Sequence, residues 1–154
     1  IDMMLAQRFG MTYIDQNNQA VYPYIIHRTS LGCYERTIAL LIEKYGGALP
    51  TWLSPEQVRI LPITEDQNEY AEEIKKKLLR CGFRPEVDSR YEKIGFKIRE
   101  AQLEKVPYML VVGAKEMEEG KVAVRSRKEG DLGAIALDEF IAKLHDEVDN
   151  KVCK

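Results

Sequence analysis

The sequence contains no hydrophobic run long enough to cross a membrane. The longest apolar stretches, residues 37–42 and 108–113, are short, whereas a membrane-spanning helix needs about 20 consecutive apolar residues. Stretches of this length suit one buried helix face or one buried strand. The sequence therefore predicts a protein without a membrane partner.

Cysteine is scarce, and the three cysteines, Cys33, Cys81 and Cys153, lie far apart. An odd number without a CxxC pair is neither a disulfide framework nor a self-contained zinc site. This usage favours a reducing compartment, so we expect a cytoplasmic protein. No Ser/His/Asp arrangement, glycine-rich phosphate loop or pair of closely spaced carboxylates stands out either.

An excess of one charge is also missing from the chain as a whole. The 23 Lys and Arg residues nearly balance the 25 Asp and Glu residues, which leaves a net charge of -2. This balance excludes the basic signature of proteins that bind nucleic acid over their whole surface. The charge is nevertheless sorted by region. Residues 84–128 carry eleven basic and eight acidic side chains, while residues from 138 onward carry three lysines and five acids.

Hydrophobic residues make up 45% of the 154 residues, enough for a folded core. The first residues, IDMM, contain neither an initiator methionine nor the basic and apolar regions of a signal peptide. We therefore expect this chain to be a piece of a larger protein.

Two prolines, Pro50 and Pro55, bound a connector over residues 50–55, since each restricts the backbone before and at its own position. The preceding residues predict a strand over 22–27 and a helix over 33–45. One strand and one helix cannot enclose a core, so residues 1–49 are expected to be part of an incomplete domain.

The residues after the connector predict a complete α/β domain. Apolar patterning indicates strands over 57–63, 84–88, 108–112 and 121–125. A capping box at Thr64 and Gln67 begins a helix that Gly82 ends, and further helices are expected over 93–104 and 137–148. The order βαβαββα predicts a layered fold with a mixed, mostly parallel sheet.

Taken one by one, the candidate site residues have ordinary structural explanations. His27 is alone, whereas a zinc site needs three or four ligands, so a structural role is favoured over a metal site. Cys33 lies where a helix start could stabilise a thiolate, but nothing else indicates a nucleophile. The basic residues of 84–128 could be a solvated face or could bind unstacked RNA bases, and the solvated face is the simpler interpretation.

Four longer stretches together resemble the threonyl-tRNA synthetase family of class II aminoacyl-tRNA synthetases. They are YIIHRTSLGCYER (24–36), PTWLSPEQV (50–58), EKIGFKIRE (92–100) and VPYMLVVG (106–113). Their order matches the C-terminal part of that family across essentially the whole chain. The resemblance implies the end of the catalytic domain over 1–49, the connector over 50–55, and a three-layer anticodon-binding domain with a five-stranded sheet over 56–154.

For the catalytic domain, the resemblance implies residues that act only in the intact parent protein. Arg36 matches the motif-three arginine that binds ATP, and Gly32 and Cys33 flank the nucleotide, although Cys33 replaces the family's common serine. His27 matches one zinc ligand, whose partners would lie upstream. The implied cofactors are ATP with Mg²⁺ and Zn²⁺, and the implied substrate is threonine, while the fragment alone is expected to be inactive.

For the anticodon-binding domain, the resemblance implies contacts to the second and third anticodon bases of tRNA(Thr), G and U, from five residues: Tyr91, Arg99, Lys105, Glu116 and Arg125. Tyr91 stands where the family often has asparagine, so stacking would replace an edge hydrogen bond. The resemblance also implies that the parent is a homodimer. The alternative is a synthetase-like paralogue whose α/β domain is a protein–protein or regulatory module.

Overall fold

The computed structural model describes residues 1–30 and 32–153. The chain divides into two compact units, Ile1–Ala39 and Leu40–Lys154, and each is described by itself. The boundary falls inside α2 (Tyr34–Tyr45), which agrees with the helix predicted over 33–45. Among the described residues, no helix combines the length and apolarity that crossing a bilayer requires.

The N-terminal unit contains short elements only. They are α1 (Leu5–Arg8) and the antiparallel pair β1 (Tyr13–Ile14) and β2 (Ala20–Val21). The strand predicted over 22–27 is wrong, since this segment makes only a single bridge, between Ile25 and Asp2. Pro23 offers no N–H for a ladder there. Apolar patterning alone therefore overstated the regular structure of this segment.

The C-terminal unit contains five strands and the helices between them. In chain order these are β3 (Val58–Pro62), the short 3₁₀ turn η1 (Glu65–Gln67), α3 (Asn68–Arg80), β4 (Pro85–Val87), α4 (Ile94–Leu103), β5 (Tyr108–Val112), α5 (Ala114–Glu119), β6 (Lys121–Ser126), β7 (Gly130–Ala136) and α6 (Leu137–Asp149). The capping box at Thr64 and Gln67 is present, as predicted.

The five strands form one mixed sheet in the order β4-β3-β5-β6-β7. The β3 strand pairs in parallel with β4 and β5, whereas β6 is antiparallel to both β5 and β7. Only β6 therefore runs against the others. The expected mixed, mostly parallel five-stranded sheet is confirmed.

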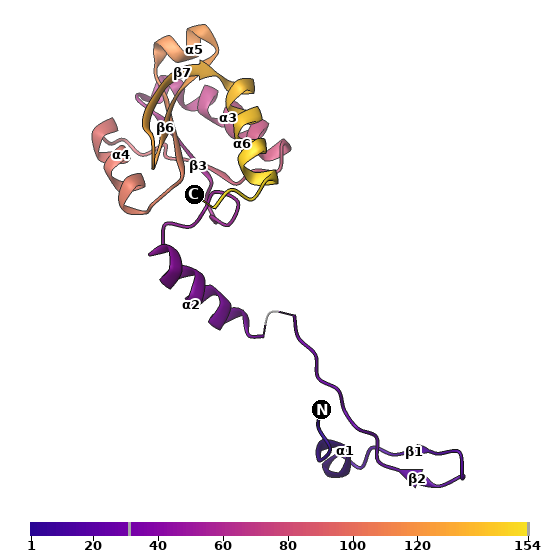
Figure 1. Cartoon of the computed structure of the whole chain (residues 1–154). Coiled ribbons are helices and arrows are strands. Elements are labelled where there is room, and N and C mark those ends of the chain that lie inside the picture. The colour runs from indigo at the N-terminus through magenta and orange to yellow at the C-terminus, as the bar shows by residue number, and fades with distance from the viewer. Residues whose placement is uncertain (31, 154) are drawn as a thin grey trace. The chain divides into compact units, whose positions relative to one another are not determined.

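Helices cover both faces of this sheet, which gives the expected three layers (Figure 1). On one face, α3 and α6 pack on the sheet through a cluster that includes Ile74, Leu78, Phe140 and Leu144. On the other face, Ala101 of α4 packs with Leu61, Val106 and Met109. Alternating residues of β3 and β5 supply both clusters, because side chains along a strand point to opposite faces.

The sequence pattern missed α5 and β7. No residue of α5 is buried, so it has no apolar stripe that a periodicity could reveal. In β7, glycines at 130 and 133 and a mostly exposed backbone replace the usual run of branched side chains. Both elements depend on their neighbours in the sheet rather than on their own sequence.

The connector and the two residues before it are hydrogen-bonded to the rest of the C-terminal unit. Arg84 donates to backbone carbonyls of Trp52 and Ser54, and Arg127 donates to those of Ala48 and Leu49. Gln57, which is buried, donates from its side chain to the Thr51 carbonyl at 3.0 Å. The connector is thus a fixed part of this unit.

Candidate nucleic-acid interface

A hollow of about 450 Å³ opens where the parallel strands β3 and β4 end. Its walls come from the segments after these strands and from the first turns of the following helices. The lining residues are Ile63, Thr64, Glu65, Asn68, Ser89, Arg90, Tyr91, Glu92, Lys93 and Lys97. The carboxyl ends of parallel strands are where open α/β sheets bind ligands, and the volume suits a nucleobase with part of its backbone.

Lys97 lies in the floor of this hollow with only 3% of its surface exposed. Its Nζ donates to the carbonyl of Pro62 at 3.1 Å and to that of Asp88 at 2.9 Å. These carbonyls are at the ends of β3 and just after β4. The ammonium group therefore joins the two strand ends beneath the hollow.

An ion-pair network fixes the wall after β4. Arg90 Nε and Nη2 donate to the two carboxylate oxygens of Asp88 at 2.8 and 2.6 Å, and Arg90 also pairs with Glu100 of α4. The guanidinium holds the pKa of Asp88 below its usual value by hydrogen bonding, against the opposing effect of burial. This network ties the segment that carries Tyr91 to α4.

Tyr91 lines the mouth of the hollow and is 90% exposed. A ring this exposed on an ordered segment provides a platform on which an unstacked base can stack. The neighbouring Lys93 also lines the hollow. The structure therefore places the first of the five predicted anticodon contacts at this hollow.

Glu116 lies beside the same end of the sheet. Its Oε2 accepts a hydrogen bond from the Gly113 N–H at 3.0 Å, which caps that backbone donor at the start of α5. A Cβ at Gly113 would lie 2.9 Å from both this oxygen and Cδ1 of Ile63, a lining residue of the hollow. The close approach that Gly113 permits brings Glu116 next to the wall of the hollow.

Arg99 and Arg125 are candidate contacts on neighbouring elements. Arg99 is exposed on α4, and half-buried Arg125 lies on β6 opposite Met109 of β5 and Asp131 of β7. Because Met109 belongs to the cluster under α4, Arg125 is on that same face of the sheet. Neither guanidinium makes an ion pair or side-chain hydrogen bond with any residue in the described part of the chain.

Lys105 lies apart from the other predicted contacts. It follows the C-terminal end of α4, whereas Tyr91 precedes the N-terminal end of that helix. Its backbone has a φ of 60°, and its Nζ donates to the carbonyl of Gly46. The structure therefore gives Lys105 a role in holding the residues before the connector.

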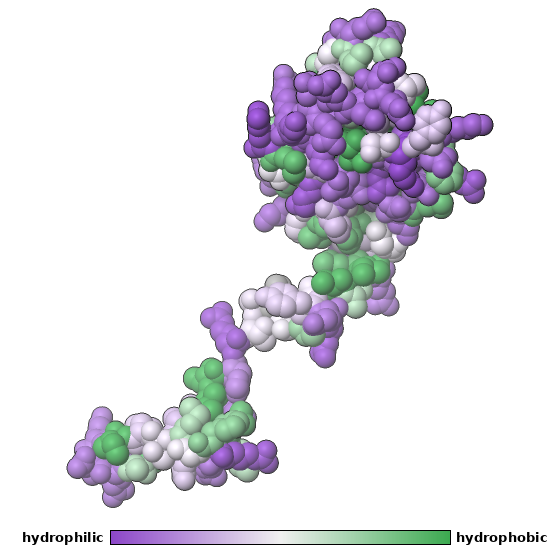
Figure 2. All heavy atoms as spheres, turned by 180° about the vertical axis from the view of Figure 1, so that it is seen from behind, coloured by the Kyte–Doolittle hydropathy of each residue, from purple (hydrophilic) through white to green (hydrophobic). Residues whose placement is uncertain are grey.

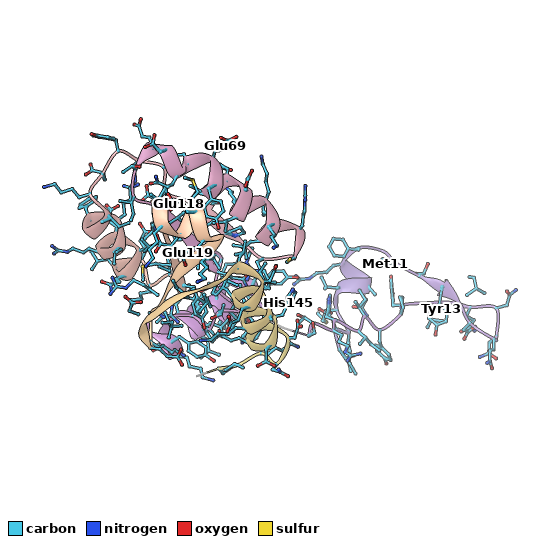
Figure 3. The ribbon with its side chains drawn as sticks, turned by 90° about the horizontal axis from the view of Figure 1, so that it is seen from above. Met11, Tyr13, Glu69, Glu118, Glu119 and His145 are labelled. Carbon is cyan, nitrogen blue, oxygen red and sulfur yellow. The ribbon has the colours of Figure 1, made fainter. Side chains whose placement is uncertain are left out.

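The surface of the C-terminal unit seen in Figure 2 is mostly hydrophilic. Acidic residues contribute as well as basic ones. Glu69 on α3 and Glu118 and Glu119 on α5 are exposed and are labelled in Figure 3. His145 of α6, also labelled in Figure 3, is partly covered, since the centroid of its ring lies 4.6 Å from that of Phe83. Basic side chains are thus interspersed with acidic ones on this surface rather than forming one continuous basic face.

The residues predicted for the catalytic fragment lie in the N-terminal unit. His27, Arg36 and Cys33 are all exposed, and the Cys33 thiol donates to Glu35 at 2.7 Å, which lowers the pKa of that carboxyl. Gly32 has a φ of 74°, a conformation that favours glycine. Residues 1–30 and 32–153 contain no group of three possible metal ligands, so His27 is at most one ligand of a zinc site.

Sequence reasoning placed Lys97 only among the basic residues of 84–128 and gave it no individual role, although one signal pointed to it. In EKIGFKIRE, Lys97 stands three residues after Ile94 and four before Ala101, at a position of the helix that faces the sheet. A lysine on such a face must satisfy its charge internally. Asn68 was missed because an isolated asparagine at a helix start is explained by capping alone.

Comparison with known proteins identifies a family for the C-terminal part of the chain and relatives for nearly all of it. The family described as "Anticodon binding domain" matches residues 57–147. The threonine–tRNA ligase of Clostridium botulinum (strain Eklund 17B) is 59% identical over 151 residues, and that of Clostridium tetani is 53% identical over 152. These matches cover 98% and 99% of this chain. The chain spans about a quarter of the length of each relative, 24% in both cases.

Two solved structures are similar over nearly the whole chain. The RNA binding domain of threonyl-tRNA synthetase from Cryptosporidium parvum Iowa II has a TM-score of 0.73 at 39% identity, covering 95% of this chain and 37% of that one. Prolyl-tRNA synthetase from the same organism has a TM-score of 0.71 at 21% identity, covering 97% and 33%. The second likeness is one of fold alone.

Proposed function

The chain belongs to the anticodon-binding domain family, and from this membership we propose that it recognises the anticodon of tRNA(Thr) as part of a threonine–tRNA ligase. The observation that carries the proposal is the 59% identity to such a ligase over 98% of the chain. The hollow at the ends of β3 and β4, with exposed Tyr91 at its mouth, provides a place for an unstacked base.

Within this proposal, four of the five predicted residues contact the anticodon directly. Tyr91 stacks on a base, and the carboxylate of Glu116 accepts N–H groups from a guanine edge. Arg99 and Arg125, whose guanidinium groups have no partner among the described residues, donate to base acceptors or phosphates. Lys105 is already bonded to Gly46, so its remaining N–H groups provide at most a phosphate contact.

The proposal for the rest of the protein concerns residues 1–49. Several large apolar side chains of the N-terminal unit are more than half exposed, among them Met3, Met4, Phe9 and Ile26. Hydrophobic spheres appear over this unit in Figure 2. Contiguous exposed apolar surface indicates an interaction partner. We take that partner to be the remainder of a catalytic domain in a homodimeric, cytoplasmic parent, with the domain boundary in the connector over 50–55.

In that parent, ATP with Mg²⁺ would supply the activation of threonine, and zinc would bind the amino acid. From this chain, Arg36 would neutralise phosphate charge, with Gly32 and Cys33 beside the nucleotide. His27 would be one zinc ligand, and its partners would come from elsewhere in the parent, since residues 1–30 and 32–153 contain no group of three possible metal ligands. We therefore expect no threonine-dependent ATP–pyrophosphate exchange by this chain, and exchange at the rate of an intact ligase would contradict this.

Filter binding tests the RNA-binding proposal. The 154-residue chain is titrated against the tRNA(Thr) transcript and against a transcript whose second and third anticodon bases are changed. We expect clearly tighter binding to the cognate RNA at the same salt concentration, because base contacts add to the phosphate term. Equal, weak binding to both would instead support a paralogue that serves as a protein–protein module.

A further inference from the structure

Lys97 has hydrogen-bonding capacity that its protein contacts do not use. A lysine ammonium has three N–H donors and no acceptor, and the carbonyls of Pro62 and Asp88 take two of them. The ammonium makes no ion pair with any residue that the structure describes. One donor therefore remains on a side chain that is 97% buried and lines the hollow.

The surroundings of this donor favour a neutral acceptor over a phosphate. Glu65 and Glu92 line the hollow, and their carboxylates repel a phosphate that enters it. Of the other two cations in the lining, Arg90 is already bonded to Asp88 and Glu100, and Lys93 is exposed to solvent. Ile63 and Tyr91 provide apolar surface on which a base ring can lie.

A pure donor at the floor of the hollow distinguishes two classes of base. Guanine O6 and uracil O4 are acceptors, whereas adenine N6 and cytosine N4 carry N–H donors at the corresponding positions. If an amino group of the base faced the Lys97 ammonium, two donors would meet and neither would have an acceptor. Leaving a buried polar group without a hydrogen-bond partner is costly.

We propose that Lys97 makes this hollow selective for a keto base of the anticodon, by donating its third N–H to O6 of guanine or O4 of uracil. This inference rests on the proposed anticodon recognition and adds to it a specificity-determining residue and the base class that it selects. Tyr91 stacks on the same base, and the network of Asp88, Arg90 and Glu100 holds Tyr91 in place.

The test removes the carbonyl from the RNA and the ammonium from the protein. In the anticodon stem–loop of tRNA(Thr), 2-aminopurine replaces guanine and lacks O6, and 2-pyrimidinone replaces uracil and lacks O4. We expect one of these replacements to weaken binding by the wild-type chain roughly tenfold. Lys97→Met is expected to bind the unmodified RNA with a similar loss and to show no further loss with that replacement.

Lys93→Met is the matched control, since Lys93 lines the same hollow but is exposed at its mouth. Like the wild-type chain, Lys93→Met should bind the RNA that lacks the carbonyl roughly tenfold more weakly than the unmodified RNA. Because Lys97→Met removes a bond between two strands, its folding is checked by thermal unfolding. The ¹⁵Nζ resonance of Lys97 in the wild-type chain gives a second readout, which should shift with the unmodified RNA and not with the sensitive replacement.

Three results would overturn the proposal. First, the wild-type chain could bind both modified RNAs normally while still rejecting other anticodon changes. Second, the Lys97 resonance could stay unmoved by RNA. Third, Lys97→Met could weaken the binding of all the RNAs equally. The last result would mean that the ammonium is only a general attractor of phosphate. Absence of any anticodon dependence in the wild-type chain would contradict the proposed function itself, so the two failures are distinguishable.

Discussion

Asp88 is the carboxylate whose ionisation the structure most clearly supports. Its pKa lies below the usual 3.8 because Arg90 donates two hydrogen bonds to it, and it is buried. A folded-state pKa below the unfolded value stabilises the fold at pH values above the unfolded pKa. That stabilisation disappears as the pH falls through the folded pKa.

We therefore expect Asp88→Asn to lower the free energy of unfolding at pH 7. It should also reduce the loss of stability on acidification below about pH 4. Urea unfolding at several pH values measures both effects. Glu86→Gln, two residues earlier on β4, is the control, since Glu86 forms an exposed ion pair with Lys75, and such pairs contribute little. Parallel acid profiles for wild type and Asp88→Asn would contradict the assignment.

Arg125 and Lys128 differ in their surroundings although both are basic. Arg125 is half-buried on the sheet face near α4, whereas Lys128 is exposed in the turn before β7. We expect Arg125→Ala to weaken cognate RNA binding roughly tenfold, as the loss of a hydrogen bond to a charged group would, and Lys128→Ala to have a smaller effect. Filter binding at two salt concentrations separates them. Equal effects that both shrink with salt would indicate only phosphate attraction.

At the scale of elements, α6 depends on one large side chain. Phe140 is fully buried in the cluster that joins α3, α6 and the sheet, and its ring packs edge-on against Tyr108 with centroids 5.5 Å apart. Phe140→Ala leaves a cavity beneath α6, so we expect a loss of about 3–5 kcal/mol in the free energy of unfolding.

Denaturant unfolding followed by circular dichroism measures this loss. Phe96→Ala on α4 is the control, because Phe96 is 45% exposed and outside both core clusters. Phe96→Ala should lower the free energy of unfolding far less than Phe140→Ala does. Similar losses for both variants would show that α6 is not packed as described.

At the scale of the whole molecule, both core clusters contain only residues from 58 onward. A chain beginning at residue 46 should therefore keep the stability and RNA binding of the full chain. A chain beginning at residue 57 should be less stable by about 1–3 kcal/mol, because Arg84 and Arg127 lose backbone acceptors. Burial lowers the pKa of Arg127, because its guanidinium is partly shielded from the water that would otherwise replace those acceptors.

Thermal and denaturant unfolding of the two truncated chains test this expectation. Retention of full stability by the shorter chain would mean that water replaces the carbonyls of the connector without cost. Aggregation of the longer chain, with loss of its cooperative transition, would show that residues 1–45 belong to the same folding unit.

The sequence predicted those parts of the fold that have a strong local pattern. The strand over 108–112 matches β5 residue for residue, and Thr64 and Gln67 form the expected capping box. By contrast, α5 and β7 have no buried periodic face and form because β6 lies beside them. For residues 22–27 the pattern predicted a strand that does not form. The apolar residues there have no neighbouring strand among the described residues.

For the site, the family resemblance supplied positions and the structure supplied their grouping. Tyr91 and Glu116 are 25 positions apart in the sequence but lie at the same end of the sheet, which no spacing rule predicts. The structure sets Lys105 apart, and it adds Lys97, whose role depends on two strand ends that meet only in the folded chain.

The two edge strands of the sheet have a consequence for self-association. β4 is only three residues long and begins with Pro85, which cannot donate to a ladder. At the other edge, a bulge between Val124 and Arg125 and the left-handed backbone of Gly133 interrupt the regularity of β7. Neither edge offers a long, flat template to a strand from another copy, so the sheet itself disfavours edge-to-edge pairing between copies of the domain.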